Sequence, residues 1–291
     1  MLEETCQKIL DCAKISGADQ ADVMAVHGTS ISIEVRKQAL EQIERSDGIE
    51  FGLRVFKGKR QAIVSGSDLS EASIKLMTER AVDMAKAAPE DPYCGLAKKS
   101  ELVAAWDVDE LELSDDQAEP QPEELENQAK EAEYFALENQ SVDQVQSASS
   151  AYSKTKIHLS ATNGFNGGYS KTSFSTSCVA IARSQSGLER DYDGDVRIFK
   201  RDLRSPEEIG IRAAKRAVSK LEARKPKTGV YPVIFDERVS SSLIGHLLAA
   251  TNGVAVAKGS SWLLNRKGTQ VLPEFLSITE DPYRKRASGS R

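Results

Sequence analysis

The fold of this chain is decided by residues 21–64, which read ADVMAVHGTSISIEVRKQALEQIERSDGIEFGLRVFKGKRQAIV. Parts of this stretch alternate apolar and polar side chains, the period of two that a half-buried strand requires. The alternating segments are residues 21–26, 31–36, 51–56 and 61–64. Asp47-Gly48 is a dipeptide typical of a tight hairpin turn. The stretch therefore predicts an antiparallel meander that is polar on one side.

A helix is predicted on each side of this meander. Residues 2–16 bring apolar side chains onto one helical face, and Gly17 ends the pattern. Residues 68–71 read DLSE, the form of a capping box, and begin a second helix that ends before Pro89. A helix, a meander and a second helix form an α+β unit, so we assign a first domain to residues 1–100.

An acidic segment follows at residues 101–138, where fourteen Asp or Glu accompany a single basic residue, Lys130. Pro120 and Pro122 lie in its middle. One interpretation is an acidic docking segment for a partner. The other is an exposed linker followed by a helix over residues 123–138 whose outer face is solvated. The sequence leaves both open.

Residues 142–203 are rich in Ser and Thr and again alternate, which predicts a central antiparallel sheet. Four strands are expected, at residues 142–151, 154–161, 169–183 and 188–199. Asn163-Gly164 and Asp193-Gly194 are expected to provide the turns. Ser205-Pro206-Glu207-Glu208 supplies an N-cap, a first-turn proline and an acidic third position, so a helix begins there. We assign residues 101–227 to this sheet domain with its helices.

Composition and charge exclude several classes of protein. The formal net charge is −5, and no basic face of the kind that binds nucleic acid is present. No run reaches the roughly 18 apolar residues that would span a membrane, and the first residues are acidic, unlike a signal peptide. Four widely spaced cysteines are expected to be reduced thiols. They are Cys6, Cys12, Cys94 and Cys178. We predict a cytoplasmic protein that binds neither nucleic acid nor membrane.

The chain contains only three histidines, His27, His158 and His246. A zinc peptidase motif places two histidines one helical turn apart beside a glutamate, and none of these three has a second His or a Cys within a turn. We expect His27 and His158 to be hydrogen-bonded sheet histidines, and His246 to lie on an apolar helix without a local partner. A site assembled from residues distant in the sequence stays open. No G-x-S-x-G nucleophile motif is present.

Residues 228–264 read TGVYPVIFDERVSSSLIGHLLAATNGVAVAKGSSWLL, in which a strand is expected at residues 231–235 and a helix at residues 236–250. This stretch resembles the third segment of the TldD/PmbA family, once called modulators of DNA gyrase, and is most similar to its PmbA (TldE) branch. Residues 47–63 and Asn163-Gly164-Phe165 are similar to the first and second segments. The resemblance covers essentially the whole chain.

The resemblance implies a cytoplasmic two-subunit peptidase that degrades or matures peptides and unfolded polypeptides. In its TldD-type subunit an H-E-x-x-x-H motif and a later cysteine hold the metal. The matching positions here are Ile244, Gly245 and Ala249, and His246 is offset from them. The resemblance thus implies no catalytic, metal or cofactor-binding residue in this chain. Zinc is expected in a TldD-like partner, with which this chain forms a hetero-oligomer unless it forms a homodimer.

The resemblance also implies that residues 228–291 begin a β-rich C-terminal domain. Because family members continue well beyond the matching point, the chain is expected to be truncated at its C-terminus. Two other functions stay open. One is a stand-alone enzyme with an unrecognised site, and the other is a regulatory protein of the gyrase-modulator type, for which the acidic segment is the only supporting feature.

Overall fold

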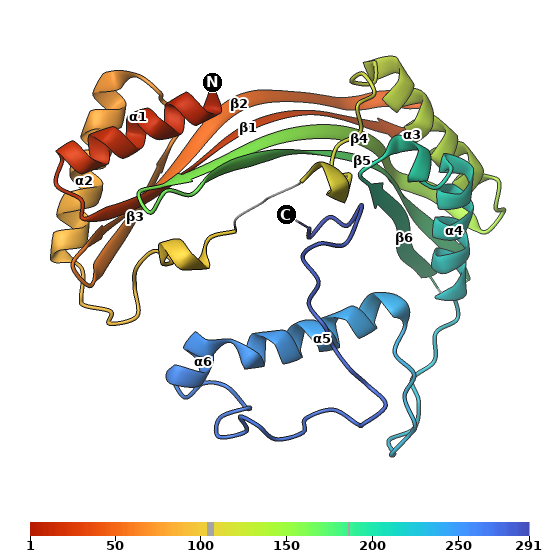
Figure 1. Ribbon diagram of the computed structural model, residues 1–291. Coiled ribbons are helices and arrows are strands. Elements are labelled where there is room, and N and C mark those ends of the chain that lie inside the picture. The colour runs from red at the N-terminus through yellow and green to blue at the C-terminus, as the bar shows by residue number, and fades with distance from the viewer. Residues whose placement is uncertain (104–107, 186, 291) are drawn as a thin grey trace. The chain divides into compact units, whose positions relative to one another are not determined.

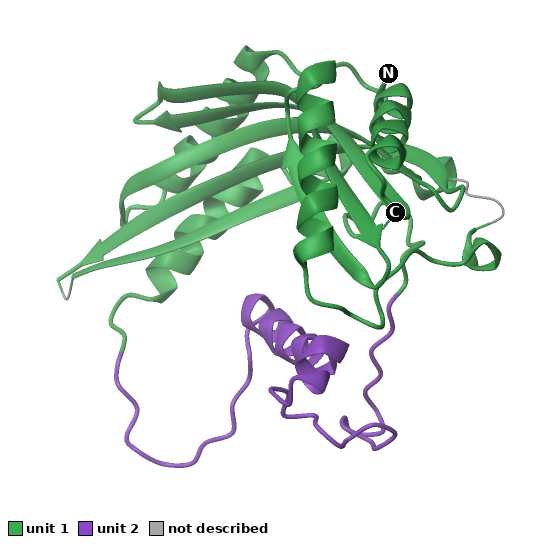
Figure 2. Cartoon of the chain, turned by 90° about the vertical axis from the view of Figure 1, so that its left-hand side faces the viewer, with its two compact units in different colours: residues 1–223, 281–291 green, residues 224–280 purple. Residues whose placement is uncertain are grey.

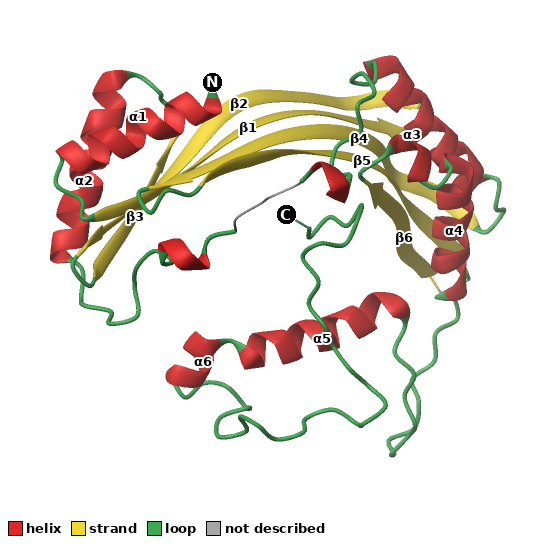
Figure 3. Ribbon diagram, viewed as in Figure 1, coloured by secondary structure: helices red, strands yellow, loops and turns green. Residues whose placement is uncertain are grey.

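The computed structural model describes residues 1–103, 108–185 and 187–290. It divides into two compact units, Met1–Ala223 with Asp281–Arg291, and Arg224–Glu280, which Figure 2 colours separately. Figure 3 shows the mixture of helices and strands. The strands are β1 (Gln20–Arg36), β2 (Ala39–Lys57), β3 (Arg60–Gly66), β4 (Val142–Ala161), β5 (Asn166–Ser184) and β6 (Gly187–Arg197). The helices are α1 (Leu2–Ile15), α2 (Glu71–Ala87), α3 (Pro122–Leu137), α4 (Pro206–Ser219), α5 (Glu237–Thr251) and α6 (Gly253–Ala257). The predicted α+β class is confirmed.

The six strands form one antiparallel sheet in the order β3-β2-β1-β4-β5-β6. Strand β1 is at its centre, paired with β2 on one side and with β4 on the other. The regions assigned above to residues 1–100 and 101–227 therefore contribute strands to the same sheet. Figure 1 shows the long strands β1 and β2 of the first region lying side by side with β4 and β5 of the second.

Four helices cover the two ends of one face of this sheet, which we call the helix-bearing face (Figure 1). Alternate residues of β1 explain the arrangement, because they point to the same side. Residues 21, 23 and 25 join the core under α1 and α2, whereas residues 31, 33 and 35 join the core with α3 and α4. Between them, His27 and Thr29 point to the same side and are partly exposed. Strand β1 thus contributes side chains to two hydrophobic cores and to a polar centre between them.

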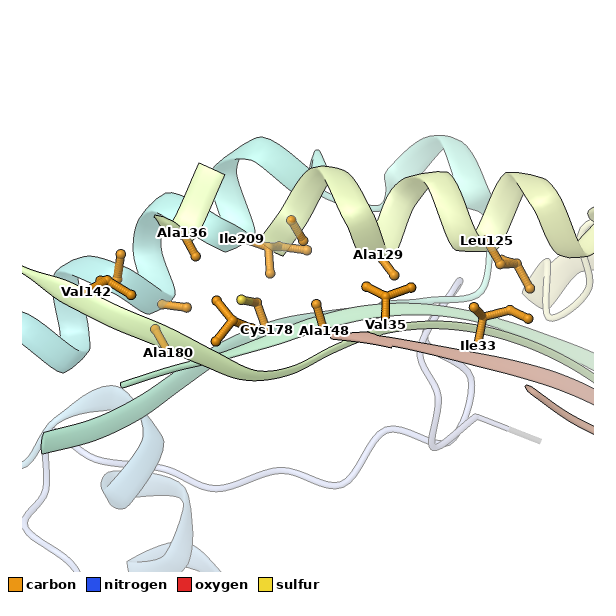
Figure 4. Packing of buried hydrophobic residues seen from close by; sticks show 14 of the residues in the cluster. Ile33, Val35, Leu125, Ala129, Ala136, Val142, Ala148, Cys178, Ala180 and Ile209 are labelled. Carbon is orange, nitrogen blue, oxygen red and sulfur yellow. The ribbon is translucent and has the colours of Figure 1, made fainter. Parts of the chain in front are cut away.

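Small side chains allow α3 and α4 to pack closely on the sheet. Gly210 of α4 lies so near α3 that a Cβ atom would collide with the carbonyl oxygen of Ala132. Figure 4 shows Ala129 and Ala136 of α3 and Ile209 of α4 facing the sheet, with Ile209 above Cys178 of β5. All four side chains are fully buried. This close approach explains why α3 and α4 are rich in alanine on their inner faces.

The first hairpin turns at Lys37-Gln38 and not at the predicted Asp47-Gly48. Strand β2 runs straight through Asp47 and Gly48, which pair with Thr29 and Gly28 of β1. Lys37 and Gln38 have positive φ angles of 55° and 60°. This left-handed conformation is unfavourable for residues other than glycine and asparagine. The turn is held by Glu133 of α3, whose carboxylate accepts the N–H groups of Lys37 at 2.7 Å and Gln38 at 2.6 Å. A residue 96 positions away thus fixes it.

The central region contains three strands and not the four that were predicted. Residues 152–153 do not interrupt β4. The turn at Asn163-Gly164 is confirmed, with Gly164 at a φ of 97°, but Asp193-Gly194 lies inside β6. The buried Asp193 carboxylate forms ion pairs with Arg204 and Arg216, so that it anchors α4 to the sheet.

The predicted N-terminus of α4 agrees with the structure, and that of α2 differs by two residues. Ser205 caps α4, its side chain accepting the N–H of Glu208 as expected. At α2 the cap is Ser70 and not Asp68, because Ser70 accepts the N–H of Ser73, while the Asp68 carboxylate accepts the N–H of Ser70. The predicted register of this capping box was therefore wrong by two residues.

The acidic segment is more than an exposed linker. Leu111, Leu113 and Asp115 are buried, and the inner face of α3 belongs to the core. The predicted helix at residues 123–138 is confirmed as α3. Residues 104–107 of the segment lie outside the described residues. Whether the acidic side chains dock a partner stays a prediction.

Residues 224–280 form the second unit, with α5 capped by Asp236, whose carboxylate accepts the N–H of Arg238. The predicted helix is confirmed. The predicted strand at residues 231–235 is wrong, since this segment has no regular secondary structure and pairs with no described strand. Side chains such as Val230 and Ile234 are almost fully exposed. Across the described residues, no helix combines the length and apolar character needed to cross a membrane.

Replacing Glu133 by glutamine should destabilise the chain by about 2 kcal/mol. The amide can accept one N–H of the hairpin turn, but its NH₂ group would face the other donor, and a partly buried donor left without an acceptor is costly. Glu131→Gln is the matched control, because Glu131 is exposed on the same helix, and it should change stability by less than about 0.5 kcal/mol. Urea denaturation measures both. Equal stability of the two variants would contradict the role of Glu133.

Cys178 should resist alkylation in the native protein. Burial, with smaller contributions from Glu133 and Asp193, raises the pKa of its thiol to about 12, so only about one molecule in ten thousand is thiolate at pH 8. Cys12 is partly exposed and should react. Mass spectrometry after iodoacetamide treatment, with and without urea, distinguishes the two sites. Rapid native modification of Cys178 would show that the α3–α4 core opens readily.

Candidate functional site

The polar centre of the helix-bearing face is the candidate site. Sheet register places its residues in two cross-strand rows. In one row His27 of β1 lies opposite Lys156 of β4, which lies opposite Ser170 of β5. In the next row Thr29 lies opposite Lys154, which lies opposite Thr172. Directly opposed residues of antiparallel strands share a face, so these six side chains form a single polar surface.

Two hollows of about 870 and 490 Å³ adjoin over this surface, since both are lined by Lys156, Gly168, Tyr169 and Ser170. We call them together the central groove. The start of α1, residues 1–3, lines one end. The segment 108–116 lines the other end.

A short stretch of main chain fixes the wall formed by residues 108–116. The N–H of Thr172 donates to the carbonyl oxygen of Leu113 at 3.1 Å, and the N–H of Asp115 donates to the Thr172 hydroxyl at 2.8 Å. The Asp115 carboxylate accepts the N–H of Lys200 at 3.1 Å. These bonds attach the wall to β5 beyond the point where β6 ends its pairing, at Phe174 opposite Arg197.

Two of the three histidines lie in the central groove. His27 lies opposite Lys156, and His158 lies opposite Ala25, so the two rings occupy diagonal positions on neighbouring strands. His27 Nε2 is 2.9 Å from Asp47 Oδ1, and His158 Nε2 is 2.8 Å from Asn166 Oδ1. Both acceptors are oxygens, so Nε2 carries the proton in each ring. The prediction of hydrogen-bonded sheet histidines is confirmed, but their proximity was missed.

A series of hydrogen bonds connects His158 to the first helix, α1. Asn166 Oδ1 also accepts the Ser160 hydroxyl at 2.8 Å, and Asn166 Nδ2 donates to Glu3 of α1 at 2.6 Å. Nearby, Gly168 leaves no room for a side chain, since a Cβ atom would lie 2.6 Å from the Ile157 carbonyl oxygen and 2.7 Å from His158 Nδ1. Gly168 is nevertheless exposed, so solvent reaches its main chain in the groove floor at β5.

The donor set does not fit a metal ion. Within the described part of the chain, no three His, Cys, Asp or Glu side chains come close enough together to bind one. His246 is exposed on α5, as are Ile244, Gly245 and Ala249. The residues at the positions expected for ligand, base and ligand are thus apolar or lack a side chain.

Positive charge lies on the floor of the central groove, and negative charge lies on its wall. Lys154 and Lys156 form no ion pair with any described residue. On the wall, Glu112 is paired with Arg286, whereas Asp109 and Asp116 add further carboxylates. The aromatic rings of Tyr169 and Phe199 also line this end. Arg201 lies over the Phe199 ring, 5.2 Å from its centre. The groove can therefore bind a polar ligand with an apolar portion.

Sequence reasoning did not find this groove, although one signal was available. His27 and Thr29 are odd-numbered, like the apolar residues that precede and follow them in the strand. Their side chains therefore lie on the same face of the strand as those apolar residues. The strand partners could not be inferred, because the pairing of β1 with β4 spans more than a hundred residues, as between Asp22 and Ala161.

Comparison with known proteins matches the chain to three parts of one family. Residues 21–85 match the PmbA/TldA metallopeptidase domain 1, residues 115–221 match its central domain, and residues 228–291 match its C-terminal domain. Metalloprotease PmbA of Escherichia coli O157:H7 is 33% identical over 285 residues, which is 97% of this chain and 62% of that protein. A PmbA homologue of Haemophilus influenzae is 31% identical over 284 residues, again 97% of this chain and 62% of the relative.

Solved structures show the same fold. A putative modulator of DNA gyrase from Bacteroides thetaiotaomicron superimposes with a TM-score of 0.89 at 24% identity, covering 99% of this chain and 65% of that one. TldE from Thermococcus kodakarensis gives a TM-score of 0.68 at 16% identity, covering 89% and 58%. The chain spans about three fifths of the length of its curated relatives. With all three family segments in order along it, the chain belongs to the PmbA/TldD metallopeptidase family.

Proposed function

We propose that this chain is a PmbA/TldE-like subunit that binds peptide but does not itself carry the catalytic metal. The observation that carries the proposal is the apolar character of Ile244, Gly245 and Ala249 on α5, where the resemblance places a metal ligand, a base and a second ligand. A peptidase built on this family then requires the metal from another subunit. That subunit is a TldD-like partner, and zinc is the metal expected in it.

The central groove supports the peptide-binding part of the proposal. It offers polar side chains on a rigid sheet, together with the exposed main chain of Gly168. A site on a sheet holds its side chains more firmly than a site on loops. We propose that peptides or unfolded polypeptides are its ligands, handled for degradation or maturation.

Cysteine chemistry supports a place in the cytoplasm. All four cysteines are free thiols, and three of them, Cys6, Cys94 and Cys178, are buried. Burial raises the pKa of the Cys6 and Cys178 thiols, which keeps both in the unreactive protonated form. Four unpaired cysteines are typical of a reducing compartment.

A regulatory function of the gyrase-modulator type is the second candidate, and the acidic segment favours it. Solved structures from Bacteroides thetaiotaomicron and Thermotoga maritima are those of proteins named putative modulators of DNA gyrase. Deleting residues 101–138 would not test it, because α3 belongs to the core. Neutralising the exposed carboxylates of Glu123, Glu131 and Glu138 leaves the core intact and tests it fairly. Loss of a gyrase interaction in that variant would support regulation over peptide handling.

The chain alone should bind only substoichiometric zinc, and a tagged TldD-like protein from the same organism should copurify with it and carry the zinc. Elemental analysis of the chain, the partner and the complex measures this. His246→Ala is the informative variant, and it should leave the zinc content and partner binding unchanged. Stoichiometric zinc on the isolated chain, lost in His246→Ala, would contradict the proposal and support a stand-alone metalloenzyme.

A further inference from the structure

The floor of the central groove concentrates hydrogen-bond donors on one side of β4. Lys154 and Lys156 are two positions apart on the strand, so both ammonium groups rise on the same face. The Ser170 hydroxyl lies beside Lys156, and the Thr172 hydroxyl lies beside Lys154. The Thr172 hydroxyl already donates to the Ile198 carbonyl oxygen. Two ammonium groups and the Ser170 hydroxyl therefore remain for a ligand, since neither lysine pairs with a described carboxylate.

The open edge of β5 adds main-chain donors. Successive residues of a strand direct their N–H and C=O groups to opposite sides, and Thr172 directs its N–H outward, to Leu113. Ser170 and Gly168 follow the same alternation, in a regular register with β4. Strand β6 pairs with β5 only from Phe174 onward. The N–H groups of Ser170 and Gly168 thus point away from β4, at a part of the β5 edge that no described strand covers.

Charge and size indicate which anion fits. A phosphate dianion would meet the lysines but also the Asp116 carboxylate on the wall, whereas a carboxylate carries a single charge. The hollow of about 870 Å³ is far larger than one oxyanion, and Tyr169 and Phe199 give it apolar surface. A carboxylate joined to a short, largely neutral chain satisfies all of these features.

We propose that the central groove binds the C-terminal carboxylate of a peptide, with Lys154 and Lys156 as its cationic partners and Ser170 as a hydroxyl donor. The proposal deepens the peptide-binding function proposed above, on which it rests, by naming the end of the peptide that this chain holds. Free peptide C-termini are exposed by any preceding cleavage, so the ligand class is short peptides and not internal segments of a folded protein.

Isothermal titration calorimetry of the chain with three probes tests the proposal. The probes are N-acetyl-tetraalanine with a free carboxylate, the same peptide as its C-terminal amide, and inorganic phosphate at matched ionic strength. We expect the free carboxylate to bind at least about tenfold more tightly than the amide, because it loses charge-assisted hydrogen bonds on amidation. Equal binding of acid and amide, or no binding of either at millimolar concentration, would overturn the proposal.

Lys154→Gln with Lys156→Gln is the test variant, and Lys8→Gln with Lys75→Gln is the matched control. The control removes the same charge from exposed positions on α1 and α2. The test variant should lose at least about tenfold in affinity for the free carboxylate, and the control should bind within about twofold of the parent. Equal losses in both variants would show a mere net-charge effect and overturn the assignment.

Phosphate distinguishes the source of the anion. Phosphate binding as tight as that of the free carboxylate, and lost in the test variant, would assign a general oxyanion site and overturn the peptide assignment. The titrations need no partner subunit. Failure to bind peptide is therefore distinguishable from failure of the wider proposal, which is read from zinc content and copurification.

Discussion

The pairing of β1 with β4 is the constraint on which the rest of this structure depends. It joins an N-terminal meander to a central sheet more than a hundred residues further along the chain, with an unbroken register from Asp22 opposite Ala161 to Val35 opposite Ala148. Because both strands are long, each reaches from one helix pair to the other (Figure 1). Two hydrophobic cores therefore share a sheet, and the distance between them is set by strand length.

A consequence of that distance is the polar centre of the sheet. A strand of seventeen residues is longer than the span that one helix pair covers, so its middle residues need not be apolar. Residues at such positions can be replaced by polar ones with little loss of stability, because their side chains contribute little to either core. His27, Lys156 and Ser170 occupy this place, on rigid strands whose backbones are bonded on both sides for most of their length. The groove thus results from the length of the strands, and it is also the most suitable ligand-binding site on this sheet.

The misplaced turns have a common cause, which is contact between residues distant in the sequence. Asp47-Gly48 and Asp193-Gly194 are good turn dipeptides, yet both lie within strands because neighbouring strands pair with them. Lys37-Gln38 is a poor turn dipeptide, yet it turns because Glu133 supplies two acceptors from another element. A local preference of about 1 kcal/mol is outweighed by partly buried, charge-assisted hydrogen bonds of larger energy.

The sequence by itself determined the α+β class, the alternation of the strands, the starts of α3, α4 and α5, and the absence of a local metal motif, since these depend on side chains close together along the chain. Its resemblance to the PmbA/TldD family also followed from local stretches. Only the tertiary structure decided that one sheet unites both halves, and that His27, His158, Lys154 and Lys156 share a floor. Register between distant strands is the physical reason, because it is chosen by the packing of both cores at once.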